Sequence, residues 1–292
     1  MNASGRVFCR HALGERAGFH FFVFLPHAAT LYDIRRGFKN CDLDRDLLLV
    51  KRVIKQLLRG LIDIHQLGFI HTDIKADNVS VPLRCDSLHG VRAFFDHPTP
   101  PLTEECEVPN IRVQLGDFSS AIKASRDTTG VKAMPRAVRA VEIILGRRWG
   151  QAVDVWALGC LMIELLGPFS VQSLAKCPEK VRSRFFRPDG SLKPAGQFLA
   201  ESFARCPEEL RSEIFHSNGS LRHPDVMKLP RRGTLQHLLR NAGLRGAELD
   251  EVHTFVGRML TLDPDHRPTA AQLLELPFVG QFDLLTNGPM ES

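Results

Sequence analysis

Apolar residues recur at spacings of three and four through the stretch from Asp44 to Gly68, so they share one face of a helix. They are Val50, Ile54, Leu57, Leu58, Leu61 and Ile64. Three basic side chains, Lys51, Lys55 and Arg59, are displaced toward the other face. The pattern therefore predicts a long amphipathic helix that has Asp44 as its N-cap and stops at Gly68.

Two further helical regions differ from the first in how their apolar residues are distributed. The stretch DVWALGCLMIELLG, from Asp154 to Gly167, is apolar on nearly every side, which is typical of a helix buried in the core. The stretch from Leu249 to Val279 has a helical period on both sides of a proline-containing turn and predicts two helices. Helices therefore dominate the predicted fold.

Strand patterns are short and few. The stretch GFHFFVFLP, from Gly18 to Pro26, is rich in aromatic and β-branched residues and predicts a buried strand. Shorter apolar runs at Asn78–Val81 and Ile111–Phe118 predict two more strands, and the proline-rich segment between them, residues 82–110, predicts a surface insertion. Together the helices and strands predict an α+β fold.

Composition and charge exclude several classes of protein. The formal net charge of +5 is mild for 292 residues, and no basic stretch is interleaved with aromatic residues, so we expect no nucleic-acid partner. The seven cysteines are scattered without a C-x-x-C pair, which argues against a disulfide framework or a zinc ribbon. No stretch has the length and apolar character of a signal peptide or a bilayer span. We therefore expect no membrane partner and an intracellular location, cytoplasmic or nuclear.

The stretch HTDIKADN, from His71 to Asn78, combines residue types that phosphoryl transfer needs. That reaction requires a carboxylate to orient the attacking hydroxyl, a cation near the moving phosphoryl group and oxygen ligands for Mg²⁺. Asp73, Lys75 and Asn78 offer one of each. Asp117, at the end of a predicted strand, offers a charged metal ligand. Taken alone, the stretch is equally compatible with a charged surface turn, because these residue types are common in turns.

The order of motifs along the chain decides between these interpretations. The segments FIHTDIKADNVSV, VQLGDFSSA, AVEIILG, DVWALGCLMIEL and MLTLDPDHRPTA follow one another. In this order they resemble the catalytic loop, the metal-binding segment, the end of the activation segment, the central helix and the closing arginine motif of eukaryotic protein kinases. The resemblance extends from about Gly18 to Val279. HTD in the place of H-R-D, and VE in the place of Pro-Glu, resemble the serine/arginine-rich protein kinases and their relatives.

The resemblance implies a role for each polar residue of the loop. Asp73 matches the catalytic base, and Lys75 matches the contact to the γ-phosphate of ATP. Asn78 and Asp117 match the ligands of Mg²⁺. ATP and Mg²⁺ are therefore the expected cofactors.

The same resemblance implies an adenine site. Phe24 matches the position at the back of the adenine pocket, and residues Leu25 to His27 match the hinge, whose backbone groups bind adenine. Ser80 falls near the apolar floor expected beneath the base. These residues are the remaining expected contacts of the nucleotide.

Five further matches are structural. Glu142 and Arg267 match a buried ion pair that ties the activation segment to the lower lobe, and removing one partner would strand a buried charge. Asp154 matches a helix residue that braces the backbone of the catalytic loop. His71 and Phe118 match packing positions in the lobe interior, so we interpret His71 as a core residue and not as a metal ligand.

The part of the chain that should form the upper lobe is short. Residues 1–26 are predicted to be the last two strands of a kinase N-lobe with the hinge, residues 27–280 the C-lobe, and residues 281–292 a tail. No G-x-G-x-x-G occurs in the sequence, which indicates a kinase that lacks most of its N-lobe. Ser119 replaces the usual glycine after Asp-Phe and restricts φ there.

These observations leave two main hypotheses of function. The first is a serine/threonine protein kinase, truncated at its N-terminus, that transfers the γ-phosphate of ATP to protein hydroxyls. The second is a pseudokinase, weak or inactive, that acts as a binding scaffold. A small-molecule phosphotransferase is disfavoured, because VEIILG and its Arg267 partner belong to the protein-kinase version of the lobe.

The substrate expectations conflict with one another. The resemblance implies Arg/Ser-rich protein substrates, yet the segment from Asp117 to Glu142 holds more bases than acids. Its bases are Lys123, Arg126, Lys132, Arg136 and Arg139, and its acids are Asp117, Asp127 and Glu142. This balance argues against strongly basic substrates. Nothing in the sequence indicates an oligomeric state.

Overall fold

The computed structural model describes residues 12–16, 19–23, 26–37, 43–83, 111–135, 138–166 and 235–280. Three groups of predictions lie outside these ranges. They concern Phe24 and Leu25, residues 84–110 of the expected insertion, and the tail at 281–292. The division into lobes and tail therefore stays a prediction.

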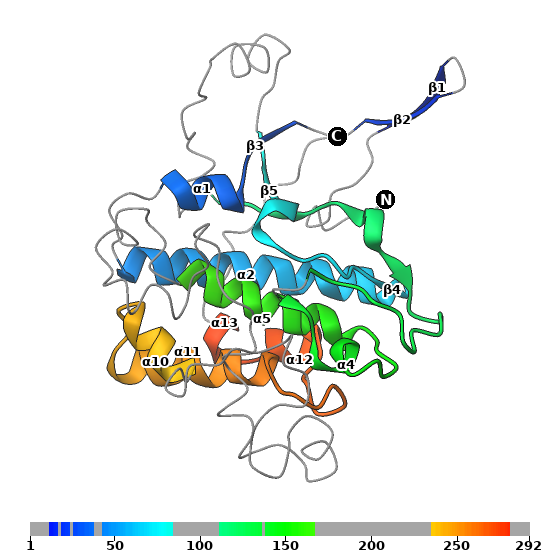
Figure 1. The fold of residues 1–292 in the computed structure, drawn as a ribbon. Coiled ribbons are helices and arrows are strands. Elements are labelled where there is room, and N and C mark those ends of the chain that lie inside the picture. Colours follow the sequence, from blue (N-terminus) through cyan, green and yellow to red (C-terminus); the bar gives the residue numbers. More distant parts are fainter. Residues whose placement is uncertain are drawn as a thin grey trace, which may run out of the picture.

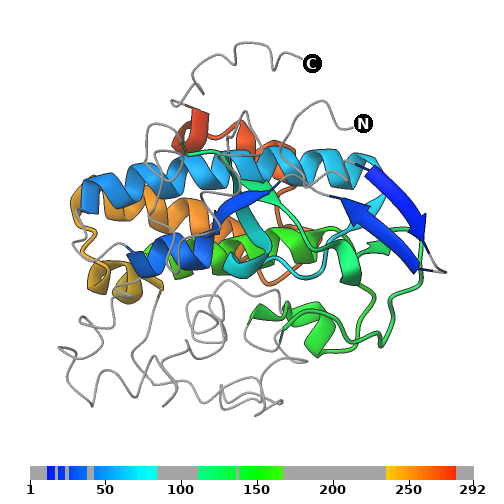
Figure 2. The same cartoon turned by 90° about the horizontal axis from the view of Figure 1, so that it is seen from above.

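Three long helices run side by side and form the body of the molecule (Figures 1 and 2). α2 (Leu43–Gln66) and α11 (Gly246–Met259) both pack against α5 (Ala152–Leu166). Shorter helices extend this body, because α12 and α13 pack against α2 while α10 packs against α11. Their bounds are α10 (Leu235–Asn241), α12 (Ala270–Leu274) and α13 (Pro277–Gly280), and the described chain also contains α1 (Leu31–Gly37) and α4 (Val141–Ile144).

The central helix α5 is buried along nearly its whole length, which confirms the prediction from its apolar composition. Gly159 lies against the end of α11. A Cβ atom at this position would be 3.0 Å from Met259 Cβ and 3.0 Å from Leu260 Cδ2. Glycine therefore permits a close approach that any larger side chain would prevent.

α2 confirms the predicted amphipathic helix, with two corrections. It begins at Leu43, so Asp44 lies inside its first turn and not at the predicted N-cap position. Lys55, expected on the polar face, is only 3% exposed, because α5, α12, α13 and short strands cover α2 on several sides. The chain turns at Gly68 as predicted, with a φ of 77° that glycine adopts without strain.

A three-stranded antiparallel sheet lies on one side of the helices (Figure 1). Its strands β3 (His27–Thr30), β5 (Val79–Pro82) and β6 (Gln114–Leu115) are arranged in the order β3-β5-β6. β5 confirms the predicted strand, shifted by one residue. Val79 and Val81 alternate with Ser80 along it and are fully buried, so one face of β5 contributes to the core.

The predicted strand at Ile111–Phe118 is much shorter than expected, because only β6 pairs with a neighbour. Upstream of β6 the backbone is bound by a helix side chain. Gln56 Nε2 donates to Ile111 O at 3.2 Å, and Val113 N donates to Gln56 Oε1 at 3.1 Å. These contacts satisfy backbone groups that a neighbouring strand would otherwise satisfy.

Two strand pairs complete the β structure of the described residues. β4 (Phe69–Ile70) pairs with β7 (Ile122–Lys123) beside the end of α2. β1 (Ala12–Arg16) and β2 (Phe19–Val23) form an antiparallel hairpin that projects from the helical body in Figure 1. β2 falls within the strand predicted from Gly18 to Pro26.

Three helices, and not the predicted two, occupy the stretch from Leu249 to Val279. α12 begins with a capping box, in which Thr269 and Gln272 each bind the backbone N–H of the other with a side-chain oxygen. Pro277 then begins α13. Proline cannot donate the hydrogen bond that would continue α12, but it fits the first turn of a new helix.

The described chain is thus mainly helical with a few short strands, which confirms the predicted α+β class. Its β structure is small compared with its helical body. Among the helices of the described ranges, none has the length and apolar composition needed to cross a membrane.

Candidate active site

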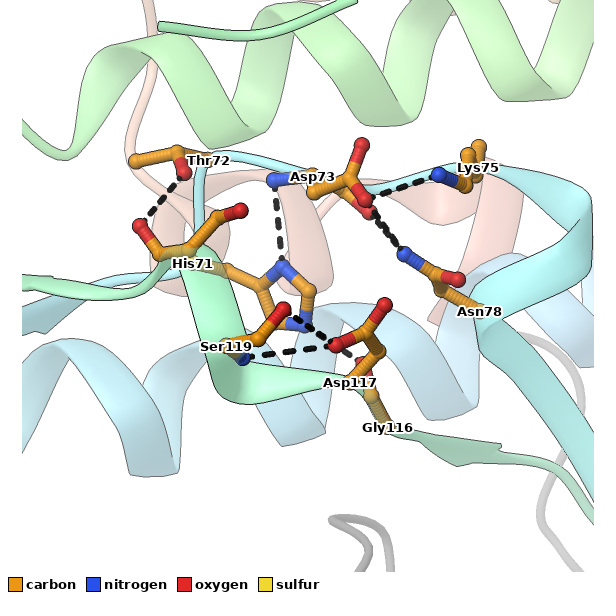
Figure 3. Close-up of polar contacts among 9 residues, drawn as sticks. His71, Thr72, Asp73, Lys75, Asn78, Gly116, Asp117 and Ser119 are labelled. Atoms are coloured by element: carbon orange, nitrogen blue, oxygen red, sulfur yellow. Dashed lines mark hydrogen bonds and ion pairs between the residues drawn. The ribbon is translucent and has the colours of Figure 1, made fainter.

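The loop between β4 and β5 brings its polar side chains together (Figure 3). Asp73 Oδ2 accepts hydrogen bonds from Lys75 Nζ and from Asn78 Nδ2, both at 2.8 Å. Asn78 Nδ2 also lies 2.8 Å from Asp73 O. The other carboxylate oxygen of Asp73 accepts no hydrogen bond from the described residues, so it is available to an incoming group.

His71 is fully buried and joins this loop to the backbone that leads to Asp117. Its Nδ1 accepts a hydrogen bond from Asp73 N at 3.2 Å, and its Nε2 lies 2.8 Å from Gly116 O. Because Nδ1 accepts from a backbone N–H, Nε2 is the ring nitrogen that donates to Gly116 O. The ring packs against Phe118 with a centroid distance of 4.9 Å. Both ring nitrogens are therefore occupied within the protein.

Asp154 holds the start of the loop from the first turn of α5. Its Oδ2 accepts from His71 N at 2.8 Å, and its Oδ1 accepts from Thr72 N at 2.8 Å. His65, in the last turn of α2, places Nε2 3.0 Å from Asp154 Oδ2. One buried carboxylate thus links two helices to the loop, whose residue Thr72 has a φ of 69°.

Asp117 enters the site from the other side, at the end of the chain that follows β6. It is exposed, and its backbone lies in the left-handed region with a φ of 56°. Its Oδ1 accepts from Ser119 Oγ at 2.6 Å and from Ser119 N at 3.3 Å. The hydrogen bond from the Ser119 hydroxyl is the largest influence on the pKa of Asp117, which lies below its ordinary value although partial burial opposes the shift.

The oxygens of Asn78 and Asp117 that make no protein contact suit a hard cation. Figure 3 shows the Asp117 carboxylate facing the amide of Asn78, with the Asp73 carboxylate beyond it. Asn78 Oδ1 and Asp117 Oδ2 accept no hydrogen bond from the described residues. The part of the chain that the structure describes holds no group of three or more His, Cys, Asp or Glu suited to a metal. This pair fits Mg²⁺, which takes few protein ligands and completes its shell with phosphate oxygens and water.

A second ion pair lies away from this cluster, inside the helical body. Arg267 Nη1 lies 2.8 Å from Glu142 Oε1, and Arg267 Nη2 lies 3.1 Å from Glu142 Oε2. Arg267 also donates to Ala152 O at 2.8 Å and to Thr261 O at 3.0 Å, and it lies over the ring of Trp156. Both partners of the pair are buried.

The fold and the loop geometry agree with the comparison to known families. Residues 30–279 match the family described as protein kinase domain. The chain belongs to this family. The predicted membership of the eukaryotic protein kinases and the predicted kinase-like fold are therefore confirmed.

Individual protein kinases match the chain at modest identity. AFC2, a serine/threonine-protein kinase of Arabidopsis thaliana, is 29% identical over 289 residues, which cover 88% of this chain and 58% of AFC2. Mitogen-activated protein kinase 12 of Danio rerio is 29% identical over 268 residues, 90% of this chain and 59% of that kinase. The dual specificity protein kinase lkh1 of Schizosaccharomyces pombe is 28% identical over 166 residues, 49% of this chain and 23% of lkh1. The chain thus spans 23% to 59% of the length of these relatives.

The residues expected around adenine are only partly described in this kinase chain. His27 is exposed on β3 and pairs with Pro82 of β5. Ser80 is 7% exposed, and its Oγ has no hydrogen-bond partner among the described residues. Phe24 and Leu25 lie outside the described ranges. The assignment of these four residues to the nucleotide stays a prediction.

Two contacts of the kinase site were missed by the sequence analysis. The bond between Ser119 and Asp117 was missed because the substitution of glycine was considered only for its effect on φ. The contact of His65 with Asp154 joins residues far apart in the sequence, and a histidine in the last turn of a helix carries no local signal of it. The second contact follows from the tertiary structure, whereas the first is a local contact between residues two positions apart.

Proposed function

We propose that this member of the protein kinase family is a serine/threonine kinase that uses ATP and Mg²⁺ to phosphorylate hydroxyl groups of protein substrates. The observation that carries the proposal is the grouping of three uncommitted oxygens. One belongs to Asp73, held by Lys75 and Asn78, and the others belong to Asn78 and Asp117. The names of the relatives, which include a serine/threonine and a dual specificity kinase, support the class of substrate.

Asp73 is the base in this proposal. Its Oδ1 accepts the proton of the substrate hydroxyl, while Oδ2 stays bound to Lys75 and Asn78. These two hydrogen bonds fix the carboxylate before the substrate arrives, which lowers the entropy lost in reaching the reactive geometry.

Lys75 and the metal ligands act on the nucleotide. The Lys75 side chain is 37% exposed, so its ammonium group can contact the γ-phosphate. Asn78 Oδ1 and Asp117 Oδ2 would hold the Mg²⁺, and the lowered pKa of Asp117 keeps that carboxylate ionised to a lower pH than an ordinary aspartate. When bound, ATP supplies the phosphoryl group and Mg²⁺ neutralises charge on its phosphates.

The direct test is the substitution Asp73→Asn. Asparagine has nearly the same shape as aspartate but cannot accept the proton, so phosphorylation of a serine-containing protein falls by about 10²- to 10⁴-fold. MgATP binding persists in this variant. Asp77→Asn is the matched control, because Asp77 is an exposed carboxylate of the same loop. Equal phosphorylation by Asp73→Asn and the unsubstituted chain contradicts the assigned role.

A binding scaffold with weak or no catalysis is the second candidate. The hydrogen bonds from Ser119 favour it, because they already occupy one of the two oxygens that Asp117 could offer to a metal. Thermal unfolding with and without MgATP discriminates between the candidates. A nucleotide at about 100 times its Kd stabilises a folded kinase by about 2.7 kcal/mol, and Asp117→Ala abolishes that shift. An unsubstituted chain that shows no shift supports the scaffold.

A further inference from the structure

The chain that follows Asp117 runs directly beside the catalytic loop. Because β7 pairs with β4, Lys123 lies opposite Phe69, two residues before His71. Thr72 Oγ1 donates to Ser120 O at 2.9 Å, which joins the two segments again. In Figure 1 this part of the chain, coloured green, continues from β4 toward α4 along one side of the molecule. Side chains on it are therefore positioned next to the loop that carries Asp73.

Farther along, the same segment is fixed to the chain that precedes α5. Thr128 is fully buried, and its Oγ1 donates to Trp149 O at 2.6 Å and accepts from Trp149 N at 2.8 Å. Trp149 Nε1 donates to Val131 O at 3.0 Å, and Gly130 N donates to Gly146 O at 3.0 Å. The exposed side chains of residues 126–132 and 146–149 therefore share one fixed surface.

The exposed charges on this surface are mainly positive. We use the name basic face for the exposed cationic side chains Lys123, Arg126, Lys132 and Arg148. Arg139, another cation of the segment, is turned inward, where its Nη2 donates to Met134 O at 2.8 Å. The charge of the basic face is thus carried by side chains in contact with solvent.

The acids of the same segment do little to cancel this charge. Glu142 is buried and paired with Arg267. Asp127 is exposed and carries its negative charge, because hydrogen bonds to its Oδ1 from Thr129 N at 3.0 Å and Thr129 Oγ1 at 2.8 Å hold its pKa below the ordinary value. This single charge, which lies near Arg148, offsets one of the four cations, so the face stays cationic.

We propose that the basic face binds acidic side chains of protein substrates, glutamates and aspartates that flank the hydroxyl to be phosphorylated. The inference rests on the proposed kinase function and adds a substrate class to it. A peptide rich in arginine would bring like charges together beside the catalytic loop, which weakens binding and slows encounter. Acidic peptides would bind the face more tightly and encounter it faster, because opposite charges attract. The implied preference is opposite to the Arg/Ser-rich substrates expected from the sequence resemblance.

The test compares three labelled peptides that share a central serine and differ in whether glutamate, glutamine or arginine flanks it. Fluorescence anisotropy measures their binding to the whole chain without nucleotide. The glutamate peptide is expected to bind about tenfold more tightly than the glutamine peptide, since several exposed ion pairs act together. The advantage shrinks when the ionic strength is raised to about 0.5 M.

Neutralising variants locate the effect on the basic face. The triple variant Arg126→Gln, Lys132→Gln and Arg148→Gln is expected to lose the tenfold preference, and each single substitution is expected to lose part of it. Thermal unfolding checks that these exposed substitutions leave the fold intact. Arg258→Gln is the matched control, because Arg258 is exposed on α11, among the helices α5, α10 and α13.

Several results would overturn the proposal. They are equal binding of the three peptides, tighter binding of the arginine peptide, and an acidic preference that survives the triple variant. Tighter binding of a single-stranded oligonucleotide of the same charge would assign the face to nucleic acid instead. A chain that binds the acidic peptide but never phosphorylates protein contradicts only the proposed function. One that phosphorylates all three peptides equally contradicts only the substrate class.

Discussion

Two ion pairs in this molecule have the same shortest distance and different surroundings. Lys75 Nζ lies 2.8 Å from Asp73 Oδ2, and Arg267 Nη1 lies 2.8 Å from Glu142 Oε1. The side chains of Lys75 and Asp73 are 37% and 15% exposed, whereas those of Arg267 and Glu142 are 0% and 1% exposed. Water therefore competes for the first pair and is excluded from the second.

The two pairs also differ in how firmly each cation is held. Arg267 has a second contact to Glu142 and further contacts to backbone carbonyl oxygens, so it cannot leave without stranding several buried groups. Among the described residues, Lys75 has one polar contact, to a carboxylate that Asn78 also holds. The distance between the charged atoms therefore does not show whether an ion pair is structural or can exchange partners. The burial of the two side chains and the number of their other contacts show this.

Breaking the buried pair should have the largest effect on stability. Arg267→Met leaves the Glu142 carboxylate buried without its cation, and we expect the free energy of unfolding to fall by about 3–5 kcal/mol. Urea denaturation followed by circular dichroism measures this change. The double variant Glu142→Leu with Arg267→Met removes both charges. It should recover part of the loss and not all, because the carbonyl oxygens of Ala152 and Thr261 still lose their donor. A double variant as unstable as the single one would contradict the importance of the stranded charge.

A smaller effect is expected at Asp117, which is exposed to water. The hydrogen bond from the Ser119 hydroxyl is the largest cause of its lowered pKa, so Ser119→Ala should raise that pKa toward the ordinary value of 3.8. The folded-state pKa lies below the unfolded one. The stabilisation it provides is therefore present above pH 3.8 and is lost as the pH falls through the folded-state pKa.

Carbon-13 NMR titration of the aspartate carboxyl groups measures this shift directly. Ser120→Ala is the control, because Ser120 contacts Thr72 through its backbone carbonyl oxygen and not through its hydroxyl. An Asp117 pKa that is unchanged in Ser119→Ala would show that the hydroxyl does not hold the carboxylate in solution.

The parts of this molecule that were predictable from sequence are those governed by local pattern. The spacing of apolar residues located α2, a run that is apolar on nearly every side located α5, and the ordered motifs indicated the kinase fold. The length of β6 was not predictable, because the backbone before it is bound by Gln56, a residue of α2 that is far away in the sequence. The burial of Lys55 depends in the same way on what packs around α2.

The candidate site shows the same division between local and tertiary information. Asp73, Lys75 and Asn78 are close in sequence and meet within one loop, so their grouping was predictable from the motif. The contact between Ser119 and Asp117 spans only two residues, yet it forms because Asp117 is left-handed. A left-handed backbone is uncommon for a residue other than glycine, so the residue types of the motif did not predict it.

The smallest effect on stability is expected at Lys75, the exposed cation of the first pair. Lys75→Met should change the free energy of unfolding by about 1 kcal/mol or less, since water already solvates much of the ammonium group and Asn78 still binds Asp73. Urea denaturation measures the change. Lys51→Met is the comparison, because Lys51 is only 12% exposed in its pair with Glu251 and should lose more. If Lys75→Met were as unstable as Arg267→Met, exposure would not be what distinguishes the two pairs. If Lys75 serves the nucleotide and not the fold, Lys75→Met should lose phosphorylation without losing stability.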